Sequence, residues 1–215
     1  MLKAAGVAPE SVAAFSVTSQ GETLIPVDES GKPIRNSIVW LDSRAEEQAA
    51  QTNAKISSDE LYARTGNAEA TGAMPAAKLM WIKQHEPEIY EKTHKFLLIA
   101  DFLRHFLCGS FATDNIMSCS TGYFDIRNNC YFDEMFKICD IEKNKLPQVI
   151  MGGKIQGRVT KQLCDEFGFD SETAVVCGGM DQVASALGSG NFTQGIVTET
   201  TGTALVIACT VDEPD

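Results

Sequence analysis

The stretch VVCGGMDQVASALGSG, residues 175–190, constrains the fold of this chain more than any other. A run typical of a buried strand leads into Gly178 and Gly179, and after one Met a helix of small residues follows Asp181. Glycines at a strand end let another group approach the backbone, and ligands of α/β folds gather where strands end and helices begin. Asp181 therefore fits two roles: a helix N-cap, which the residue type alone favours, or a base that a substrate can reach.

The rest of the chain alternates strand and helix signals, which predicts an α/β fold in two units. Gly152 and Gly153 break the chain, so we place a first domain at residues 1–152 and the beginning of a second at 153–215. The first should hold strands at 12–18, 95–99 and 123–126, a hairpin turning at 28–31, helices at 43–53, between Ser57 and Gly66, from Pro75 and at 101–107, and a helical region ending in residues 143–150. The second should hold strands at 155–159 and 174–177, helices at 160–167 and 181–187, and a hairpin turning at Thr201 and Gly202.

Charge and cysteine usage exclude several classes of partner. The 18 basic and 29 acidic residues give a net charge of −11, and no basic patch interrupts it, so we expect no nucleic-acid partner. Seven cysteines without a CxxC pair indicate reduced, largely buried thiols, and the three histidines match no metal-ligand spacing. We expect no membrane partner and a cytoplasmic protein, because the chain has no spanning apolar run and its N-terminus lacks the apolar core of a signal peptide.

Two further segments carry residues suited to a ligand. Trp40 and Asp42 follow one extended run, and Gln20 and Glu22 follow another. An indole can cover the C–H face of a polyol while charged groups bind its hydroxyls, although a half-buried Trp beside a surface ion pair with Arg44 explains the same pattern. The turn TETTGTA, residues 198–204, offers hydroxyls and backbone N–H groups that could cradle an anion, or is simply a polar hairpin turn.

Taken together, these segments resemble the FGGY family of carbohydrate kinases. PAAKLMWIKQH, at Pro75–His85, resembles the family's first signature, with Lys78 and Trp81 in place and Ala73 departing from the usual opening residue. SQGETLIPVDESGKPIRNSIVWLDSR resembles the glycerol kinase segment in which a Gln, an Arg and a Glu precede a hairpin and a Trp. CGGMDQVASALGSG followed by TTGTA resembles the family's catalytic Asp segment and its phosphate-contacting turn.

The resemblance implies an actin-like ATPase (ribonuclease H-like) fold, and a chain that holds most of the first domain and the start of the second. It implies ATP-dependent phosphorylation of a small-molecule sugar or polyol, with ATP and Mg²⁺ as cofactors and Asp181 as general base. Gly21 stands where glycerol kinases carry an Arg, so a ketopentose such as xylulose is favoured over glycerol. The other site residues implied are Gln20, Glu22, Trp40 and Asp42 for the sugar and Gly202 and Thr203 for the ATP phosphates, with no protein metal site.

The resemblance also implies that parts of the family are absent. No Asp-x-Gly-Thr loop opens the sequence and no adenosine-binding glycines close it, so we expect a truncated piece of a kinase that turns over weakly or not at all by itself. An exposed sheet edge would favour a homodimer. A non-catalytic sugar-binding or scaffold module is the alternative, whereas a hydrolase finds no second carboxylate at supporting spacing.

Overall fold

The computed structural model describes residues 2–202 and 204–212. Its helices are α1 Leu2–Ala5, α2 Glu46–Asn53, α3 Ser58–Thr65, α4 Pro75–His85, α5 Pro87–Lys92, α6 Ile99–Cys108, α7 Asn115–Ser118, α8 Asp133–Cys139, α9 Lys161–Phe167 and α10 Asp181–Gly188, with 3₁₀ turns η1 Pro9–Ser11 and η2 Lys143–Lys145. Its strands are β1 Ala14–Ser19, β2 Leu24–Val27, β3 Lys95–Leu98, β4 Ala112–Asp114, β5 Phe124–Asp125, β6 Cys130–Tyr131, β7 Gln148–Ile150, β8 Ile155–Arg158, β9 Ala174–Met180, β10 Val197–Thr201 and β11 Leu205–Cys209.

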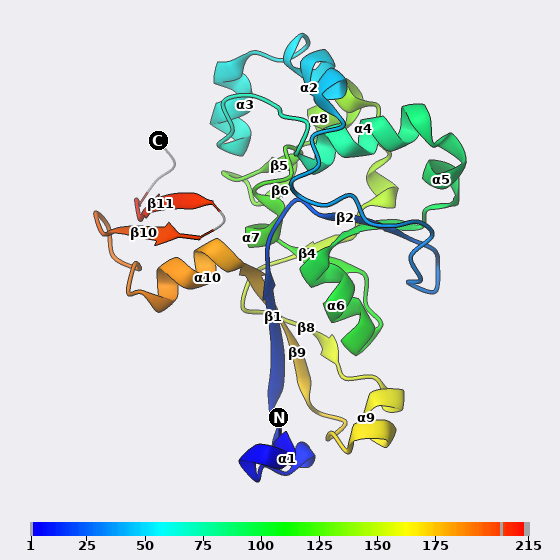
Figure 1. Cartoon of the computed structure of the whole chain (residues 1–215), viewed down its shortest axis with the longest axis vertical. Helices are drawn as coiled ribbons and strands as arrows, with labels where there is room; N and C mark the ends of the chain where they lie inside the picture. The colour runs from blue at the N-terminus through cyan, green and yellow to red at the C-terminus, as the bar shows by residue number, and fades with distance from the viewer. Residues whose placement is uncertain (1, 203, 213–215) are drawn as a thin grey trace.

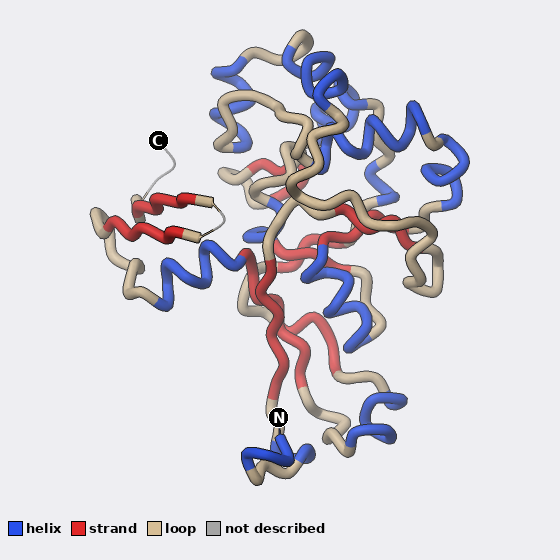
Figure 2. Tube along the Cα trace, viewed as in Figure 1, coloured by secondary structure: helices blue, strands red, loops and turns tan. Residues whose placement is uncertain are grey.

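The elements form a helical upper part, a stem of strands and a lateral arm (Figures 1 and 2). The stem is a three-stranded sheet in the order β1-β9-β8, in which β9 runs parallel to β1 and antiparallel to β8. Helix α10 leads away from the upper end of β9 to the hairpin β10-β11 (Figure 1). Strands from both sides of residue 152 therefore share one sheet, and the expected domain boundary falls between β7 and β8.

Local capping signals locate several helix ends correctly. The hydroxyl of Ser57 accepts from the backbone N–H of Glu60 at 3.2 Å, and α3 ends at Gly66 with φ of +75°. Thr160 caps α9 in the same way, and Gly168 closes it with φ of +79°. Ser and Thr side chains satisfy first-turn N–H groups, and glycine adopts the left-handed C-terminal conformation without a Cβ clash.

One expected element is wrong and another is only partly regular, because regular pairing partners lie far away in sequence. Strand β7 lies in the region expected to be helical and pairs in parallel with β4. The expected hairpin around Asp28 turns as predicted, but its second arm makes only isolated bridges to β2, at Pro33 and Ile38. The regular partner of β2 is β3, which is antiparallel to it.

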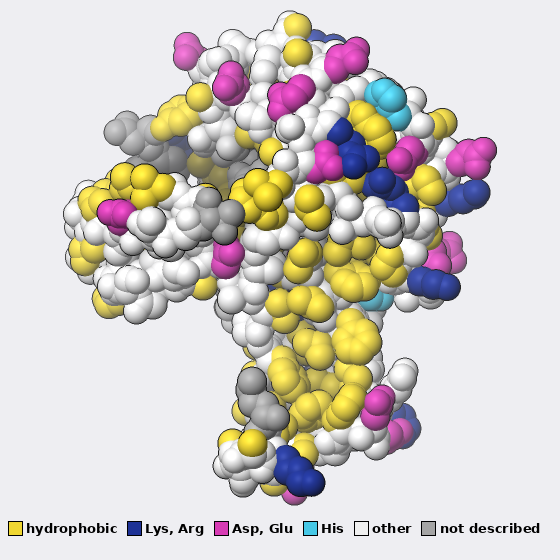
Figure 3. Space-filling model, viewed as in Figure 1, with side chains coloured by type: hydrophobic (Ala, Val, Ile, Leu, Met, Phe, Trp, Pro, Cys, Tyr) yellow, Lys and Arg dark blue, Asp and Glu magenta, His cyan; other side chains and the backbone are white. Residues whose placement is uncertain are grey.

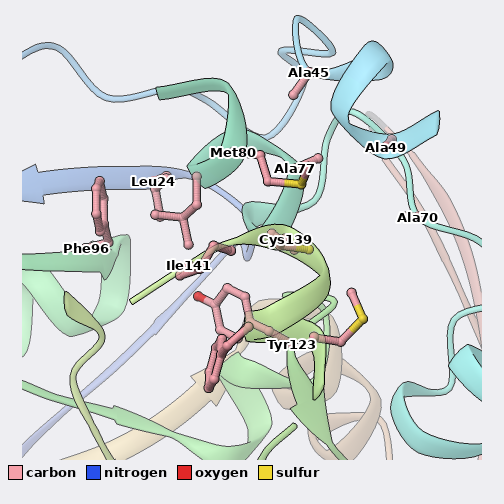
Figure 4. Close-up of a cluster of buried hydrophobic side chains, with 14 of the residues drawn as sticks. Leu24, Ala45, Ala49, Ala70, Ala77, Met80, Phe96, Tyr123, Cys139 and Ile141 are labelled. Atoms are coloured by element: carbon pink, nitrogen blue, oxygen red, sulfur yellow. The ribbon is translucent and has the colours of Figure 1, made fainter. Parts of the chain in front are cut away.

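The main hydrophobic core lies in the upper part and packs around α4 (Figure 4). On this helix Ala77 and Met80 are buried and Trp81 is half-buried. Leu79 and Ile82 are fully buried as well, so α4 is enclosed on most of its circumference. Each such side chain contributes about 1.5–3 kcal/mol relative to an exposed one.

Hydrophobic side chains also gather on the surface of the stem (Figure 3). Among the described residues, exposed hydrophobic side chains include Phe106 of α6, with 63% of its surface exposed, and Phe167 of α9, with 51%. Strand β1 lies at an edge of the described sheet, as expected. All seven cysteines are free thiols, but among them only Cys139 and Cys177 are buried, fewer than expected. Within the described ranges, every helix is too short or too polar to span a bilayer.

Candidate functional site

The parallel pairing of β1 with β9 brings two predicted site segments together. Gln20 and Glu22 follow the last residue of β1, and Asp181 follows the last residue of β9. Because parallel strands end at the same edge of a sheet, the two segments lie side by side at the top of the stem (Figure 1). The sequence predicted this placement only through the resemblance, since residues 19 and 180 are far apart along the chain.

The Gly178-Gly179 pair shapes the end of β9. The register of the two strands shifts here, so that Val17 pairs with Cys177 but Thr18 pairs with Gly179. A Cβ at Gly178 would lie 2.2 Å from the carbonyl oxygen of Val17, and Gly179 has φ of +129°. We expected these glycines to admit an approaching group, and the groups that approach them belong to the protein itself. The pair therefore makes a β-bulge that sets the direction in which the chain enters α10.

A cavity of about 460 Å³ opens at this edge of the sheet and collects most of the predicted site residues. Its walls come from the segment after β1, the segment after β2, the start of α10 and the β10-β11 hairpin. Its described lining residues are Gln20, Gly21, Glu22, Trp40, Met180, Asp181, Gln182, Thr200, Gly202, Ala204 and Val206. Asp42 lies outside this set, and Thr203 lies outside the described residues.

The hydroxyl of Thr23 connects two sides of the cavity. It accepts a hydrogen bond from the side-chain amide of Gln20 at 2.6 Å and another from the backbone N–H of Trp40 at 3.0 Å. Leu24 and Ile38 exchange two backbone hydrogen bonds beside it, at 2.9 and 3.0 Å. Thr23 is buried and was not singled out from the sequence. The positions of Gln20 and Trp40 therefore depend on one hydroxyl group.

Glu22 has both an unusual backbone and a perturbed carboxyl group. Its φ of +56° lies in the left-handed region, which few residues other than glycine adopt. Burial raises its pKa above the ordinary value, the Ser120 hydroxyl and Lys78 oppose that rise, and the negative charge of Asp181 adds to it. Two carboxyl groups, those of Glu22 and Asp181, thus share the cavity. Such strain and pKa perturbation are typical of functional sites.

Asp181 does not cap α10, although its residue type alone favoured the role of a helix N-cap. The N-cap position is occupied by Met180, and Asp181 is the first helical residue. Its Oδ1 accepts from the backbone N–H of Gln182 at 2.8 Å. A carboxylate in the first turn is still favoured by the helix dipole. Its half-buried side chain lines the cavity, where it can reach a bound hydroxyl group.

Asp42 forms an ion pair with Arg44 and is not among the lining residues of the cavity. Arg44 donates to its carboxylate from Nε at 2.9 Å and from Nη2 at 2.6 Å. This pairing holds the pKa of Asp42 at about 2. The guanidinium also lies over the ring of Trp81, 4.8 Å from its centroid. The structure thus separates Trp40, in the cavity, from the Asp42–Arg44 pair, and the sugar-binding role assigned to Asp42 stays a prediction.

The hairpin turn supplies another wall of the cavity. Thr200 and Gly202 line the cavity, and a Cβ at Gly202 would meet no atom within 4 Å. The backbone N–H of Gly202, expected to contact an anion, here donates to the carbonyl of Ala204 at 3.2 Å. That N–H is therefore engaged within the turn, while the space before it is open.

Several lining residues were missed in the sequence. Gln182 follows Asp181 directly and Thr200 belongs to the hydroxyl-rich turn, so their positions beside predicted residues were the available signals. Met180 could have been noticed as the single large residue between the glycines and Asp181. Its sulfur and the Ser120 hydroxyl would lie 3.3 and 2.9 Å from a Cβ placed on Gly21. Any side chain at position 21 would therefore displace its neighbours.

Magnesium was expected together with ATP. No group of three or more His, Cys, Asp and Glu side chains able to hold a metal ion occurs within residues 2–202 and 204–212. Mg²⁺ is usually held by one or two carboxylates together with substrate phosphates, so it would enter as part of the substrate Mg-ATP.

Several known proteins resemble this chain in sequence. The sequence model for the FGGY family of carbohydrate kinases, N-terminal domain, matches residues 1–188. Xylulose kinase of Escherichia coli (strain K12) is 29% identical over 84% of this chain and 37% of its own length. Glycerol kinase of Thermococcus kodakarensis is 30% identical over 99% of this chain and 42% of its own.

A solved structure resembles this chain over a similar share of its length. The crystal structure of ligand-bound xylulose kinase from Lactobacillus acidophilus superposes with a TM-score of 0.85 and 25% identity, covering 94% of this chain and 41% of that one. This likeness confirms the actin-like α/β fold. The chain therefore spans about two-fifths of the length of the relatives it matches. Since the family model covers most of the sequence, the chain belongs to the FGGY family of carbohydrate kinases.

Proposed function

We propose that this chain carries the sugar pocket and the general base of an ATP-dependent carbohydrate kinase. The observation that supports it most is the shared cavity, in which Asp181 lies with Gln20, Glu22 and Trp40 on one side and the Gly202 turn on the other. Polar groups and one aromatic face on a concave surface suit a polyol. The opposite wall leaves open space in which the phosphates of Mg-ATP can approach.

The reaction needs little covalent chemistry from the protein. The substrate hydroxyl oxygen forms a bond to the γ-phosphorus of Mg-ATP, the bond from that phosphorus to the β–γ bridging oxygen breaks, and ADP leaves. Asp181 accepts the hydroxyl proton. In a loose phosphoryl-transfer transition state the base mainly orients the nucleophile. Glu22 and Gln20 hold other hydroxyl groups, and the indole of Trp40 covers an apolar face of the sugar.

A ketopentose such as xylulose is the favoured substrate over glycerol. Glycine at position 21 removes the fork of donors that an arginine would provide. The contacts of Ser120 and Met180 with an added Cβ, at 2.9 and 3.3 Å, leave no space for such a side chain without rearrangement. One relative of this chain is named a xylulose kinase and another a glycerol kinase, so the names alone do not decide between these substrates.

The test combines calorimetry with a sensitive phosphoryl-transfer assay. D-Xylulose, gluconate and glycerol are titrated into the chain, and transfer from radiolabelled Mg-ATP is followed for each. We expect D-xylulose to bind most tightly, and Asp181→Asn to reduce transfer by about 10²–10⁴-fold while its sugar affinity stays within about threefold. Sugar binding without transfer and without any calorimetric response to Mg-ATP would favour the non-catalytic binding module. Unchanged transfer by Asp181→Asn would refute the assignment of the base.

A further inference from the structure

Lys78 is a charged residue in the N-terminal half of helix α4, among hydrophobic neighbours. Its side chain is fully buried, although Ala77 and Leu79 on either side belong to the main core. Lysine is rarely buried completely unless its ammonium group has partners. The cavity residues do not include Lys78, so its burial requires a reason other than direct contact with a ligand.

The ammonium group bonds to the backbone of two cavity segments. Nζ donates to the carbonyl oxygen of Glu22 at 3.1 Å and to that of Val39 at 2.8 Å. Val39 directly precedes Trp40, so both carbonyl groups belong to or adjoin residues that line the cavity. The same carbonyl of Val39 also accepts from the N–H of Asp42. One cation therefore connects the segment after β1 to the segment after β2.

The backbone of Glu22 needs such a connection. Its left-handed φ of +56° costs about 1–2 kcal/mol for a residue with a Cβ, and a conformation of this kind persists only where its surroundings fix it. The hydroxyl of Thr23, the residue after Glu22, accepts from the N–H of Trp40, and Lys78 donates to the Glu22 carbonyl itself. Hydrogen bonds from an ammonium group are about twice as strong as neutral ones.

The charged groups that face Lys78 are the carboxylates of Glu22 and Asp42 and the guanidinium of Arg44. Burial lowers the pKa of Lys78 to about 8, the two carboxylates oppose that shift, and Arg44 adds to it. The ammonium form is thus present at neutral pH and is lost as the pH rises through about 8. Above that pH the neutral amine holds the two carbonyl oxygens less strongly.

We propose that Lys78 is a positioning residue that holds Glu22 and Trp40 in the arrangement that binds the sugar. It acts through the backbone carbonyls of Glu22 and Val39 and does not touch the substrate. This inference rests on the proposed function for its effect on sugar affinity. Its effect on the two backbone segments is independent of that function.

Lys78→Met is the test variant and Lys83→Met its matched control. Lys83 lies on the same helix and also donates to a backbone carbonyl, that of Asp140 at 2.7 Å, away from the cavity. We expect Lys78→Met to raise the dissociation constant for D-xylulose by about 10–100-fold, the effect of leaving a buried acceptor without its partner. Its kcat should fall less than its affinity, and Lys83→Met should stay within twofold of the wild type. Equal effects of the two variants on sugar affinity would overturn the proposal.

The pH dependence gives a second measurement on the unaltered chain. Sugar affinity should fall as the pH rises from 7 to 9, with a midpoint near the Lys78 pKa of about 8. This step should be absent in Lys78→Met and present in Lys83→Met. A wild-type affinity that is constant from pH 7 to 9 would count against the proposal, even if Lys78→Met failed to fold.

Hydrogen exchange separates failure of this inference from failure of the proposed function. If the chain binds no sugar, exchange at residues 19–24 and 38–42 still reports the connection between the two segments. After correction for intrinsic rates, both segments should exchange faster at pH 9 than at pH 7 in the wild type, and faster in Lys78→Met than in Lys83→Met at pH 7. Equal protection in both comparisons would show that Lys78 is only a buried core residue.

Discussion

Gly178→Ala tests whether the bulge in β9 places Asp181. The added Cβ would stand 2.2 Å from the carbonyl oxygen of Val17 and 2.8 Å from the hydroxyl of Ser16. Real Cβ atoms essentially never approach other atoms more closely than 3.0 Å, and the Val17 oxygen belongs to a paired strand. The overlap requires a strand displacement of roughly 1 Å, and overpacking of this kind destabilises by about 1–3 kcal/mol. Because α10 begins three residues later, the same displacement reaches Asp181.

Urea unfolding measures the first effect without assuming any function. We expect Gly178→Ala to lower the free energy of unfolding by about 1–3 kcal/mol, with an unchanged slope against urea concentration. Gly188→Ala is the control, since a Cβ there meets no atom within 4 Å and position 188 is helical. That variant should be neutral or more stable by up to about 1 kcal/mol. Indistinguishable unfolding midpoints for Gly178→Ala, Gly188→Ala and the wild type would refute the close approach at position 178.

The displacement should also affect catalysis, if the proposed function is correct. A misplacement of about 1 Å in a reacting group can reduce the rate by about 100-fold. Gly178→Ala should therefore lose most phosphoryl transfer although Gly178 does not line the cavity, while Gly188→Ala keeps it. The same transfer assay that tests Asp181→Asn measures both variants.

Three further predictions concern residues outside the cavity. Asp42→Asn should change the free energy of unfolding by less than about 1 kcal/mol at neutral pH, and its effect on D-xylulose affinity tests the sugar-binding role. Because its pKa is lowered to about 2, Asp42 should contribute its full share of the unfolding free energy above its ordinary pKa and lose that share as the pH falls through about 2. A large loss of sugar binding by Asp42→Asn would place Asp42 in the site. Ser57→Ala should lower the unfolding free energy by about 1 kcal/mol through loss of the α3 cap, as measured in urea. Brief alkylation followed by mass spectrometry should label the exposed Cys130 and Cys209 first, and early labelling of buried Cys139 would contradict the packing of the core.

Local sequence signals predicted the fold best where the stabilising interactions are local. The ends of α3 and α9 follow from side-chain caps and C-terminal glycines that lie within one helical turn. Strand β7 could not be predicted in this way, because its regular partner, β4, lies more than thirty residues earlier. Strand β9 likewise continues to Met180, three residues beyond its expected end, because pairing with β1 resumes after the bulge.

Most of the residues singled out from the sequence line the cavity, but the hydrogen bonds that hold them in place were not predicted. Resemblance to a known family located Gln20, Glu22, Trp40 and Asp181, and all four line one cavity. The connections through Thr23 and Lys78 were not predicted, since each depends on which backbone groups tertiary folding places beside the side chain. A lysine inside the apolar sequence PAAKLMW was the available signal, because a buried ammonium requires partners.

The left-handed backbone at Glu22 places two selective pressures in opposition at a single codon. Glycine or asparagine would adopt its φ of +56° with less strain, so laboratory evolution for heat resistance alone should drift toward those residues. Enrichment for growth on the sugar should instead retain the carboxylate. The residue that becomes enriched at position 22 would then show whether stability or growth on the sugar is under selection.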